Sequence, residues 1–125
     1  MTTSQDSPRR LVEIRAYRLK PGTRDDFHAA VTRQALPMVR AHGMDVVAHG
    51  PVVNDDNGYF LVRSFATLAE LTAQEDGFYG SAAWRQGPRE ALVSRIETYI
   101  DTLLWLGPAA IDDLRAGNVP PPVQG

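Results

Sequence analysis

Four strand-like stretches, separated by two helical regions, most constrain what this chain can fold into. Residues 11–19 alternate with the period of two that marks a β-strand, and further strands are predicted over 44–53, 59–65 and 94–106. The resulting order, β-α-β-β-α-β, is that of the ferredoxin-like fold. With right-handed crossovers it gives an α+β domain in which both helices lie on one face of a four-stranded antiparallel sheet.

The two helical regions have recognisable start signals. Thr23 and Asp26 form a capping-box pattern before the first helix, and Thr67 and Glu70 repeat the pattern before the second region. A further helix is expected over 82–92. These signals place both helical regions between predicted strands, as the ferredoxin-like order requires.

We expect one domain over residues 10–107, flanked by two less regular segments. Residues 1–9 are polar and lack periodicity, so they are expected to be flexible. Residues 108–125 are expected to form a short helix and a Pro-rich tail, whose Pro120-Pro121-Pro122 run favours extended chain.

The composition argues against several kinds of partner and chemistry. The formal net charge is −2, so the chain has no basic field that would attract nucleic acid or an anionic membrane. It has no cysteine, which excludes disulfides and thiolate chemistry. No stretch approaches the roughly 20 apolar residues of a membrane span, and the first residues lack the apolar run of a secretory signal. We therefore expect a cytoplasmic protein without nucleic-acid or membrane partners.

The two faces of the predicted sheet differ in composition. The more apolar face is expected to meet the helices and comprises Val12, Ile14, Ala16, Val46, Ala48, Phe60, Val62, Ile96, Ile100 and Leu104. The other face mixes charges with aromatic rings and includes Glu13, Arg15, Tyr17, His49, Tyr59, Arg63, Glu97, Tyr99, Asp101 and Trp105. Because so many aromatic rings are unusual on a solvated face, we expect a second copy to cover it in a homodimer with a polar lumen. The alternative is a ladder of surface ion pairs.

Several short segments resemble a known family. They are Val12-Glu13-Ile14-Arg15-Ala16-Tyr17, Leu19-Lys20-Pro21-Gly22, Phe27, Ala35-Leu36-Pro37, His42-Gly43, Asp76-Gly77-Phe78-Tyr79-Gly80-Ser81, Trp84-Arg85, Gly87-Pro88-Arg89-Glu90-Ala91, and Ile96, Glu97 and Tyr99. Over residues 11–106 the chain is similar to NIPSNAP-type proteins of the dimeric α+β barrel superfamily. The resemblance implies a barrel formed by two subunits. Similar folds host cofactor-independent monooxygenases, isomerases, decarboxylases and dehydratases as well as non-catalytic binders, so it implies no single activity.

Four residues are candidates for catalysis. Arg15 could hold a carboxylate, enolate or phenolate with its guanidinium, although a structural salt bridge is the alternative. Tyr17 could donate a hydrogen bond to a carbonyl oxygen. Glu97 is a candidate general base if burial raises its pKa, and His49 is the histidine best placed for proton transfer. By helical spacing His28 is expected on the solvent side of its helix.

Five more residues are candidates for substrate binding, and no cofactor is expected. They are Glu13, Tyr59, Arg63, Tyr99 and Trp84. Glu13 is also a second candidate base, and Trp84 is expected to close one mouth of the pocket. The three histidines lack zinc-site spacing, and no glycine-rich loop has the strand-to-helix context of a phosphate site, so neither a metal nor a nucleotide cofactor is predicted.

Three functions remain open. The first is a cofactor-independent enzyme, of the monooxygenase, isomerase, lyase or dehydratase type, acting on a small organic molecule such as an aromatic or polyketide-like one. The second is a non-catalytic small-ligand-binding or accessory protein. The third is a scaffold that binds a partner through the Pro-rich tail.

Overall fold

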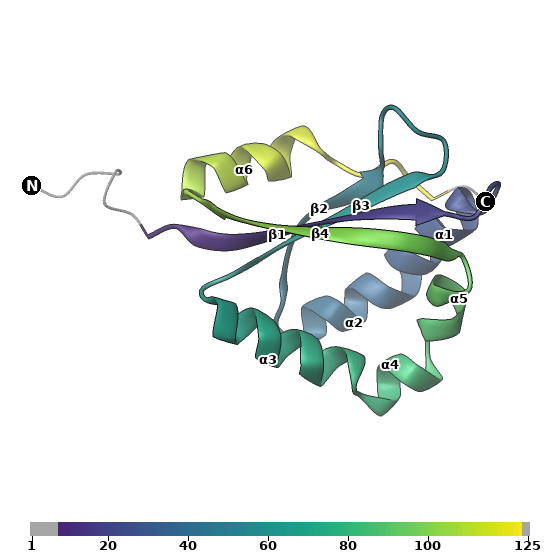
Figure 1. Cartoon of the computed structure of the whole chain (residues 1–125), viewed down its shortest axis with the longest axis horizontal. Helices are drawn as coiled ribbons and strands as arrows, with labels where there is room; N and C mark the ends of the chain where they lie inside the picture. The colour runs from purple at the N-terminus through teal and green to yellow at the C-terminus, as the bar shows by residue number, and fades with distance from the viewer. Residues whose placement is uncertain (1–7, 124–125) are drawn as a thin grey trace, which may run out of the picture.

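Four antiparallel strands form one sheet in the order β2-β3-β1-β4 (Figure 1). The strands are β1 (Arg10–Leu19), β2 (Asp45–Pro51), β3 (Gly58–Phe65) and β4 (Ile96–Leu106). This is the ferredoxin-like arrangement that the sequence predicts. The structure is a computed structural model, and it describes residues 8–123. Most of the segment predicted to be flexible, residues 1–7, and the last two residues of the tail lie outside this range.

The first helical region is continuous but not uniform. It consists of α1 (Arg24–Ala30), the π-helical η2 (Val31–Ala35) and α2 (Leu36–Ala41). Because proline lacks the N–H that would bond to the carbonyl four residues earlier, the wider π turn just before Pro37 accommodates it. The capping box predicted at Thr23 is wrong, since its hydroxyl donates to the Lys20 carbonyl instead.

The second helical region is divided into three helices. They are α3 (Leu68–Tyr79), α4 (Ala82–Gln86) and α5 (Arg89–Val93). The capping box of α3 is confirmed, because Thr67 Oγ1 accepts from the Glu70 amide and the Glu70 carboxylate accepts from the Ala66 amide. The single helix predicted over 82–92 is interrupted at Gly87 and Pro88, which end α4 and begin α5.

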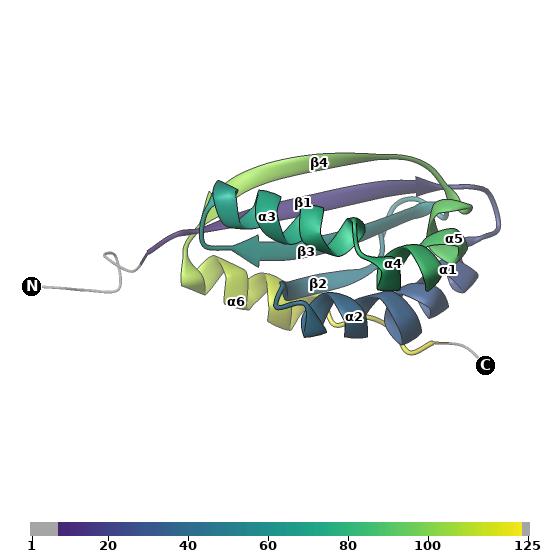
Figure 2. The same cartoon turned by 90° about the horizontal axis from the view of Figure 1, so that it is seen from below.

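Helices cover both faces of the sheet unequally. Helices α1 to α5 lie on one face, and α6 (Pro108–Gly117) crosses the opposite face near β2 (Figures 1 and 2). Ile111 of α6 packs with Val12, Val47 and Val62 in a small apolar cluster on that outer face. Among residues 8–123, no helix has both the length and the apolarity needed to cross a membrane.

The prediction of which sheet face meets the helices is wrong. The main core joins Leu11, Leu19 and Leu61 to helix residues such as Phe27 and Leu36, so the face that also holds the charged residues is the inner one. Residues Val12, Ile14, Ala16, Ala48, Phe60, Val62, Ile100 and Leu104 therefore belong to the outer face. The prediction assumed that the more apolar face meets the helices. That assumption fails here, because the charges on the inner face are buried as mutual ion pairs.

Two residues of the predicted apolar set do reach the helix side. Val46 and Ile96 contact the main core. The register of β2 against β3 shifts between Val46 and Ala48, and that of β4 against β1 shifts between Arg18 and Leu19. Since each shift of one residue exchanges the two faces, the irregularities place these side chains among the helices.

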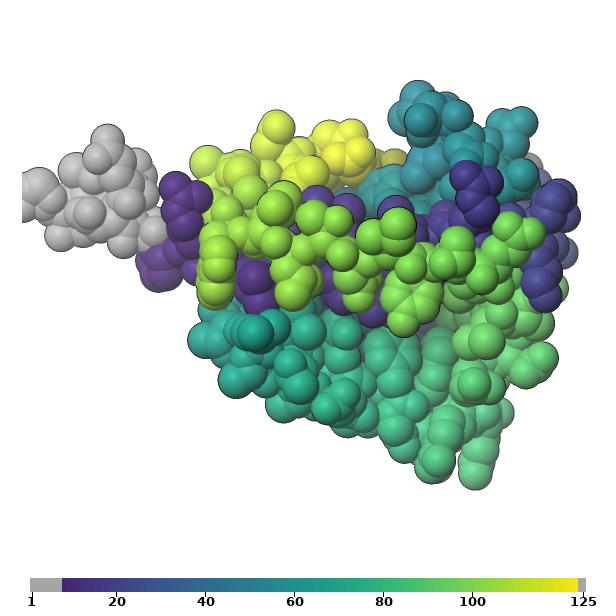
Figure 3. All heavy atoms as spheres, viewed as in Figure 1, coloured from purple at the N-terminus to yellow at the C-terminus, as the bar shows by residue number. Residues whose placement is uncertain are grey.

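Strand β4 forms an open edge of the sheet. Its side chains run along the surface between α6 and α3 (Figure 3). Ile100 and Leu104, on the outer face, are 69% and 43% exposed, and Trp105 is also exposed. The outer face is therefore covered by α6 on the β2 side and left apolar and open on the β4 side.

Candidate functional site

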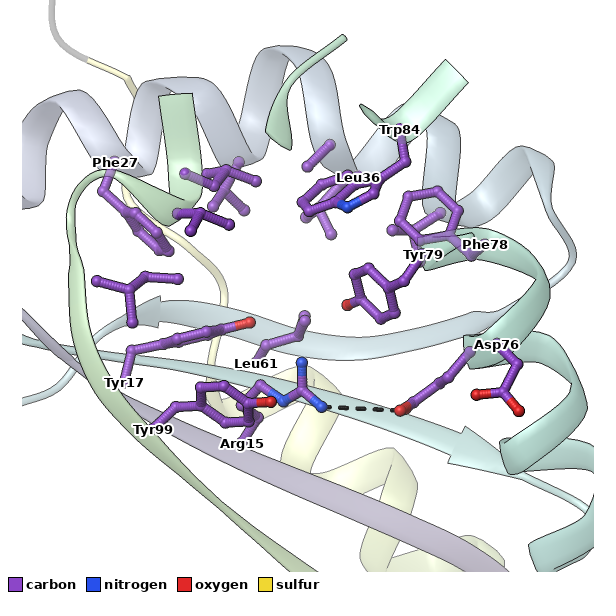
Figure 4. Close-up of a pocket in the computed structure, with 17 residues that line it drawn as sticks. Arg15, Tyr17, Phe27, Leu36, Leu61, Asp76, Phe78, Tyr79, Trp84 and Tyr99 are labelled. Carbon is purple, nitrogen blue, oxygen red and sulfur yellow. Dashed lines mark ion pairs between the residues drawn. The ribbon is translucent and has the colours of Figure 1, made fainter. Parts of the chain in front are cut away.

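A cavity of about 380 Å³ lies between the sheet and the helices. Its walls are largely apolar and aromatic, formed by Phe27, Val31, Ala35, Leu36, Val39, Leu61, Phe78, Trp84, Leu92, Val93 and Ile96. Its polar groups gather toward the sheet and α3, where they come from Arg15, Tyr17, Glu75, Asp76, Tyr79 and Tyr99 (Figure 4). A concave, mostly apolar space with a few convergent polar groups is typical of small-molecule sites.

Arg15 of β1 is held in a fixed position at the polar side of the cavity. Its Nε and Nη2 donate to the two carboxylate oxygens of Asp101 at 2.6 and 2.9 Å, and Nη2 also donates to Glu13 at 3.3 Å. The Tyr99 ring lies 4.4 Å from the guanidinium carbon, a cation–π contact. Although burial alone would raise it, the pKa of Asp101 is held below its usual range by the hydrogen bonds from Arg15.

Arg63 of β3 is completely buried behind Arg15. Its Nη2 lies 2.7 Å from Glu13 Oε1 and 3.1 Å from Glu75 Oε2, and its Nη1 donates to the Tyr79 hydroxyl at 2.9 Å. Glu75 also lies 3.7 Å from Arg15, as the dashed line in Figure 4 marks. Glu13, Arg15, Arg63, Glu75 and Asp101 are thus joined by ion pairs, and we call them the charged cluster.

Within the charged cluster, the Glu13 carboxyl has a pKa that is shifted toward neutral pH. Burial and, next, a hydrogen bond with Glu75 raise the pKa of Glu13, whereas Arg63 and Arg15 lower it, and the net result is a pKa of about 8. Glu13 therefore retains a proton near neutral pH. Glu13, which the sequence suggests as a second candidate base, therefore has the raised pKa that such a role requires.

A second polar network lies apart from the cavity. His28 Nδ1 and His49 Nδ1 are 2.6 and 3.1 Å from the Tyr59 hydroxyl, and His28 Nε2 is 2.9 Å from the Pro121 carbonyl oxygen. A carbonyl only accepts, so His28 Nε2 donates to the Pro121 carbonyl oxygen. Burial is the main reason that the pKa of His49 falls to about 4. The solvent-facing position predicted for His28 is wrong, because this network buries it.

The structure separates the sequence-predicted residues into three groups. Arg15, Tyr17, Tyr99 and Trp84 line the cavity. Glu13 and Arg63 lie directly behind it in the charged cluster. The remaining three are elsewhere: Tyr59 and His49 belong to the second network, and Glu97 is exposed on β4 at the register shift.

The sequence reasoning missed the polar cavity residues Glu75, Asp76 and Tyr79, and the most informative of them is Glu75. It lies on α3 four residues after Leu71 and three before Phe78, and both of those side chains are buried. Residues at these spacings share one helix face, so a glutamate there interrupts a core stripe. A carboxylate in such a stripe is the signal that could have identified it. Among the described residues, no group of three His, Asp or Glu side chains is arranged to hold a metal ion.

The structure is that of a ferredoxin-like α+β protein with an internal, mostly apolar cavity, and solved structures share this fold. A NIPSNAP family protein of unknown function from Agrobacterium tumefaciens gives a TM-score of 0.72 at 17% identity, covering 78% of this chain and 88% of that one. An uncharacterised NIPSNAP domain protein from Burkholderia xenovorans gives 0.69 at 18% identity, covering 78% and 95%. A candidate antibiotic biosynthesis monooxygenase from Bordetella bronchiseptica gives 0.58 at 24% identity, covering 78% and 95%.

The chain therefore has the fold of NIPSNAP family proteins, as its resemblance over residues 11–106 predicts. No protein-family model matches the chain, and no curated protein matches its sequence. Sequence identities this low define the fold and leave the activity to be argued from the site.

Proposed function

We propose that this chain is a cytoplasmic homodimer whose cavity binds a small, largely apolar aromatic molecule and acts on it without a cofactor. The observation that supports this most is the shape of the cavity: aromatic and aliphatic side chains form most of its wall, and the polar groups face it from one side. Isomerase-, lyase-, dehydratase- or monooxygenase-type chemistry would each use such a pocket, with the ring system held by packing and its oxygen atoms held by hydrogen bonds.

The charged cluster favours a neutral ligand over an anionic one. Arg15 already donates to Asp101 and Glu13, and Glu75 lies beside it, so negative charge surrounds its guanidinium. A ligand carboxylate would approach these three carboxyl groups at close range. We therefore expect Arg15 to hold a hydroxyl or carbonyl oxygen of the ligand rather than a carboxylate. The Tyr17 and Tyr99 hydroxyls would be further hydrogen-bond donors to it.

Filling the cavity should abolish binding of a neutral aromatic probe. We expect 1-naphthol to quench the fluorescence of Trp84 in a Trp105→Phe background, where Trp84 is the remaining tryptophan. Ala35→Phe, which places a ring inside the cavity, should weaken this binding at least tenfold, whereas the same change at exposed Ala83 should not. The anionic 1-naphthoate should bind at least tenfold more weakly than 1-naphthol.

Either of two results would contradict this use of the cavity. One is equal affinity of 1-naphthol for the Ala35→Phe and Ala83→Phe variants, which would place the probe elsewhere. The other is tighter binding of 1-naphthoate, which would show that Arg15 attracts anions despite its neighbours. Tight binding without chemical change of any bound ligand would favour the second candidate, a non-catalytic binder. The hydrogen bonds within the charged cluster support that candidate, because they give Arg15 a structural role.

A second copy would cover the outer face along β4. The edge at β2 is already blocked, since Arg115 of α6 donates to the Val46 carbonyl at 3.0 Å and the tail lies against Gly50. The edge at β4 is long, unpaired and apolar, a combination that proteins normally cover. The homodimer is thus proposed through the apolar outer face. The earlier expectation that a partner covers the charged face is wrong, because the chain's own helices cover it.

A charge in the centre of β4 should prevent this dimer. Ile100→Glu would bury a carboxylate against the partner, so we expect light scattering to give a single-chain mass at a concentration at which the parent protein gives twice that mass. Val53→Glu, which likewise replaces an aliphatic side chain with a carboxylate but at a fully exposed loop position, should leave the dimer intact. A dimeric Ile100→Glu variant or a monomeric parent protein would place the interface elsewhere or remove it.

A further inference from the structure

The charges of the cluster do not balance if every group is ionised. It contains three carboxyl groups, from Glu13, Glu75 and Asp101, and two guanidinium groups, from Arg15 and Arg63. Full ionisation leaves one net negative charge beside an apolar cavity, where desolvation makes it unfavourable. One bound proton makes the cluster neutral.

The geometry indicates where that proton resides. Asp101 is partly exposed and accepts two hydrogen bonds from Arg15, so its ionised form is the most stabilised of the three carboxyl groups. Glu13 and Glu75 instead converge on the same nitrogen of Arg63, at 2.7 and 3.1 Å. Two carboxyl groups brought this close share a proton more readily than they both ionise.

Burial supports the same location. The side chain of Glu13 is 1% exposed, and burial and the hydrogen bond with Glu75 together raise its pKa to about 8. Glu75 is 14% exposed and lines the cavity, while Glu13 is sealed behind it. A bound molecule can therefore exchange a proton with Glu75 directly and with Glu13 only through Glu75.

We infer that Glu75 is the acid–base residue of this cavity and that it shares one proton with Glu13. The inference rests on the proposed function, since it requires a ligand in the cavity. It assigns Glu75 as a catalytic residue that touches the ligand and Glu13 as a positioning residue that acts through Glu75. It also defines the ligand class as a neutral carbon acid, namely an aromatic ketone or its enol.

The proton and charge balance fits such a ligand. The Glu75 carboxylate takes a proton from the carbon next to the carbonyl, the C–H bond breaks, and its electron pair forms the C=C bond of an enolate. The negative charge moves to the ligand oxygen beside Arg15 and Tyr17, and the cluster gains one positive charge as Glu75 becomes protonated. Returning the proton from Glu75 to the ligand oxygen completes a keto–enol isomerisation without any other reactant.

Hydrogen–deuterium exchange tests the role of Glu75. With 2-tetralone as the probe in D2O, the parent protein should accelerate loss of the proton NMR signals next to the carbonyl. Glu75→Gln should slow this exchange at least 100-fold, as expected for loss of a general base, while in the Trp105→Phe background 2-tetralone still quenches Trp84 with an affinity within threefold. Glu90→Gln, the same change at an exposed position of α5, should have no effect on either measurement.

Infrared spectroscopy tests the shared proton without a ligand. At pH 6.5 the protein should show the C=O stretch of a protonated carboxyl group, sensitive to D2O, and Glu13→Gln should remove it while Glu90→Gln should not. Absence of this band in the parent protein would overturn the shared proton. Unchanged exchange in Glu75→Gln with binding retained would overturn the acid–base role alone. Failure of 2-tetralone to bind would overturn the proposed ligand-binding function, and the role of Glu75 with it.

Discussion

Replacing Arg63 with methionine should lower the free energy of unfolding by about 3–5 kcal/mol. Arg63 is completely buried, and it contacts Glu13, Glu75 and the Tyr79 hydroxyl. Methionine fills a similar volume but leaves two carboxyl groups without their nearest positive charge and the half-buried Tyr79 hydroxyl without this hydrogen bond. Urea unfolding of both proteins at pH 7 measures the loss.

A matched variant and a double mutant separate charge from packing. Arg18→Met removes an exposed guanidinium that lies 3.7 Å from Asp55, and it should cost less than about 1 kcal/mol. Adding Glu13→Gln to Arg63→Met should recover part of the lost stability, because it removes one of the orphaned carboxyl groups. If Arg63→Met were as stable as Arg18→Met, the ion pairs of the charged cluster would make no net contribution.

The topology could be predicted from the sequence because it depends on local patterns. The period of two in 11–19 and 59–65 and the capping box at Thr67 each specify an element within a few residues. The element order then allows few sheet topologies. The helix boundary at Gly87 was missed, since apolar residues continue on both sides of it.

The orientation of the sheet could not be predicted from such patterns. Both of its faces are occupied by large side chains, and the rule that the more apolar face meets the helices fails when charges neutralise one another. Arg63 is buried because Glu13 on the neighbouring strand and Glu75 on α3 supply opposite charges, and Glu13 lies 50 residues before Arg63 in the sequence. Arg15 and Tyr17 were nevertheless grouped together and both line the cavity, because strand alternation places them on one face regardless of which face it is.

The candidate site was therefore predicted in part. The sequence grouped Arg15, Tyr17 and Tyr99, which all line the cavity, but it also included the exposed Glu97 and omitted the helix that completes the cavity. Glu75 reaches Arg15 and Arg63 only because α3 packs across that face, a tertiary contact without a sequence signal of its own beyond the interrupted apolar stripe. His49 was predicted to lie in the site, but it contacts the Tyr59 hydroxyl, which also contacts His28, in a network apart from the cavity. This arrangement is likewise a tertiary contact that the sequence does not show.

Glu13→Gln should change how stability depends on pH. In the unfolded chain the Glu13 carboxyl loses its proton near pH 4.3, whereas in the folded protein burial raises its pKa to about 8. Between these values unfolding releases a proton, so the free energy of unfolding of the parent protein falls as the pH rises, by about 1 kcal/mol per unit. Glutamine resembles the protonated carboxyl group, so the variant should lack this decline.

The other titratable groups decide which pH range is suitable for this measurement, beginning with the charged groups around Glu13. They are Arg15 on β1, Arg63 on β3, Glu75 on α3 and Asp101 on β4. The pKa of Asp101 is lowered, so its contribution to the free energy of unfolding is lost only at acidic pH. His49 opposes Glu13 below about pH 6.5, because burial lowers the pKa of its imidazole to about 4 and the unfolded chain binds the extra proton.

The comparison is therefore clearest between pH 6.5 and 8, by urea unfolding of the parent protein, Glu13→Gln and Glu90→Gln. At pH 6.5 all three should have similar stability. At pH 8 Glu13→Gln should exceed the others by about 1–2 kcal/mol, because its amide avoids the desolvated charge that forms on Glu13. Parallel curves for the parent protein and Glu13→Gln would mean that Glu13 is already ionised at pH 6.5, and the charged cluster would then hold no proton for Glu75 to share.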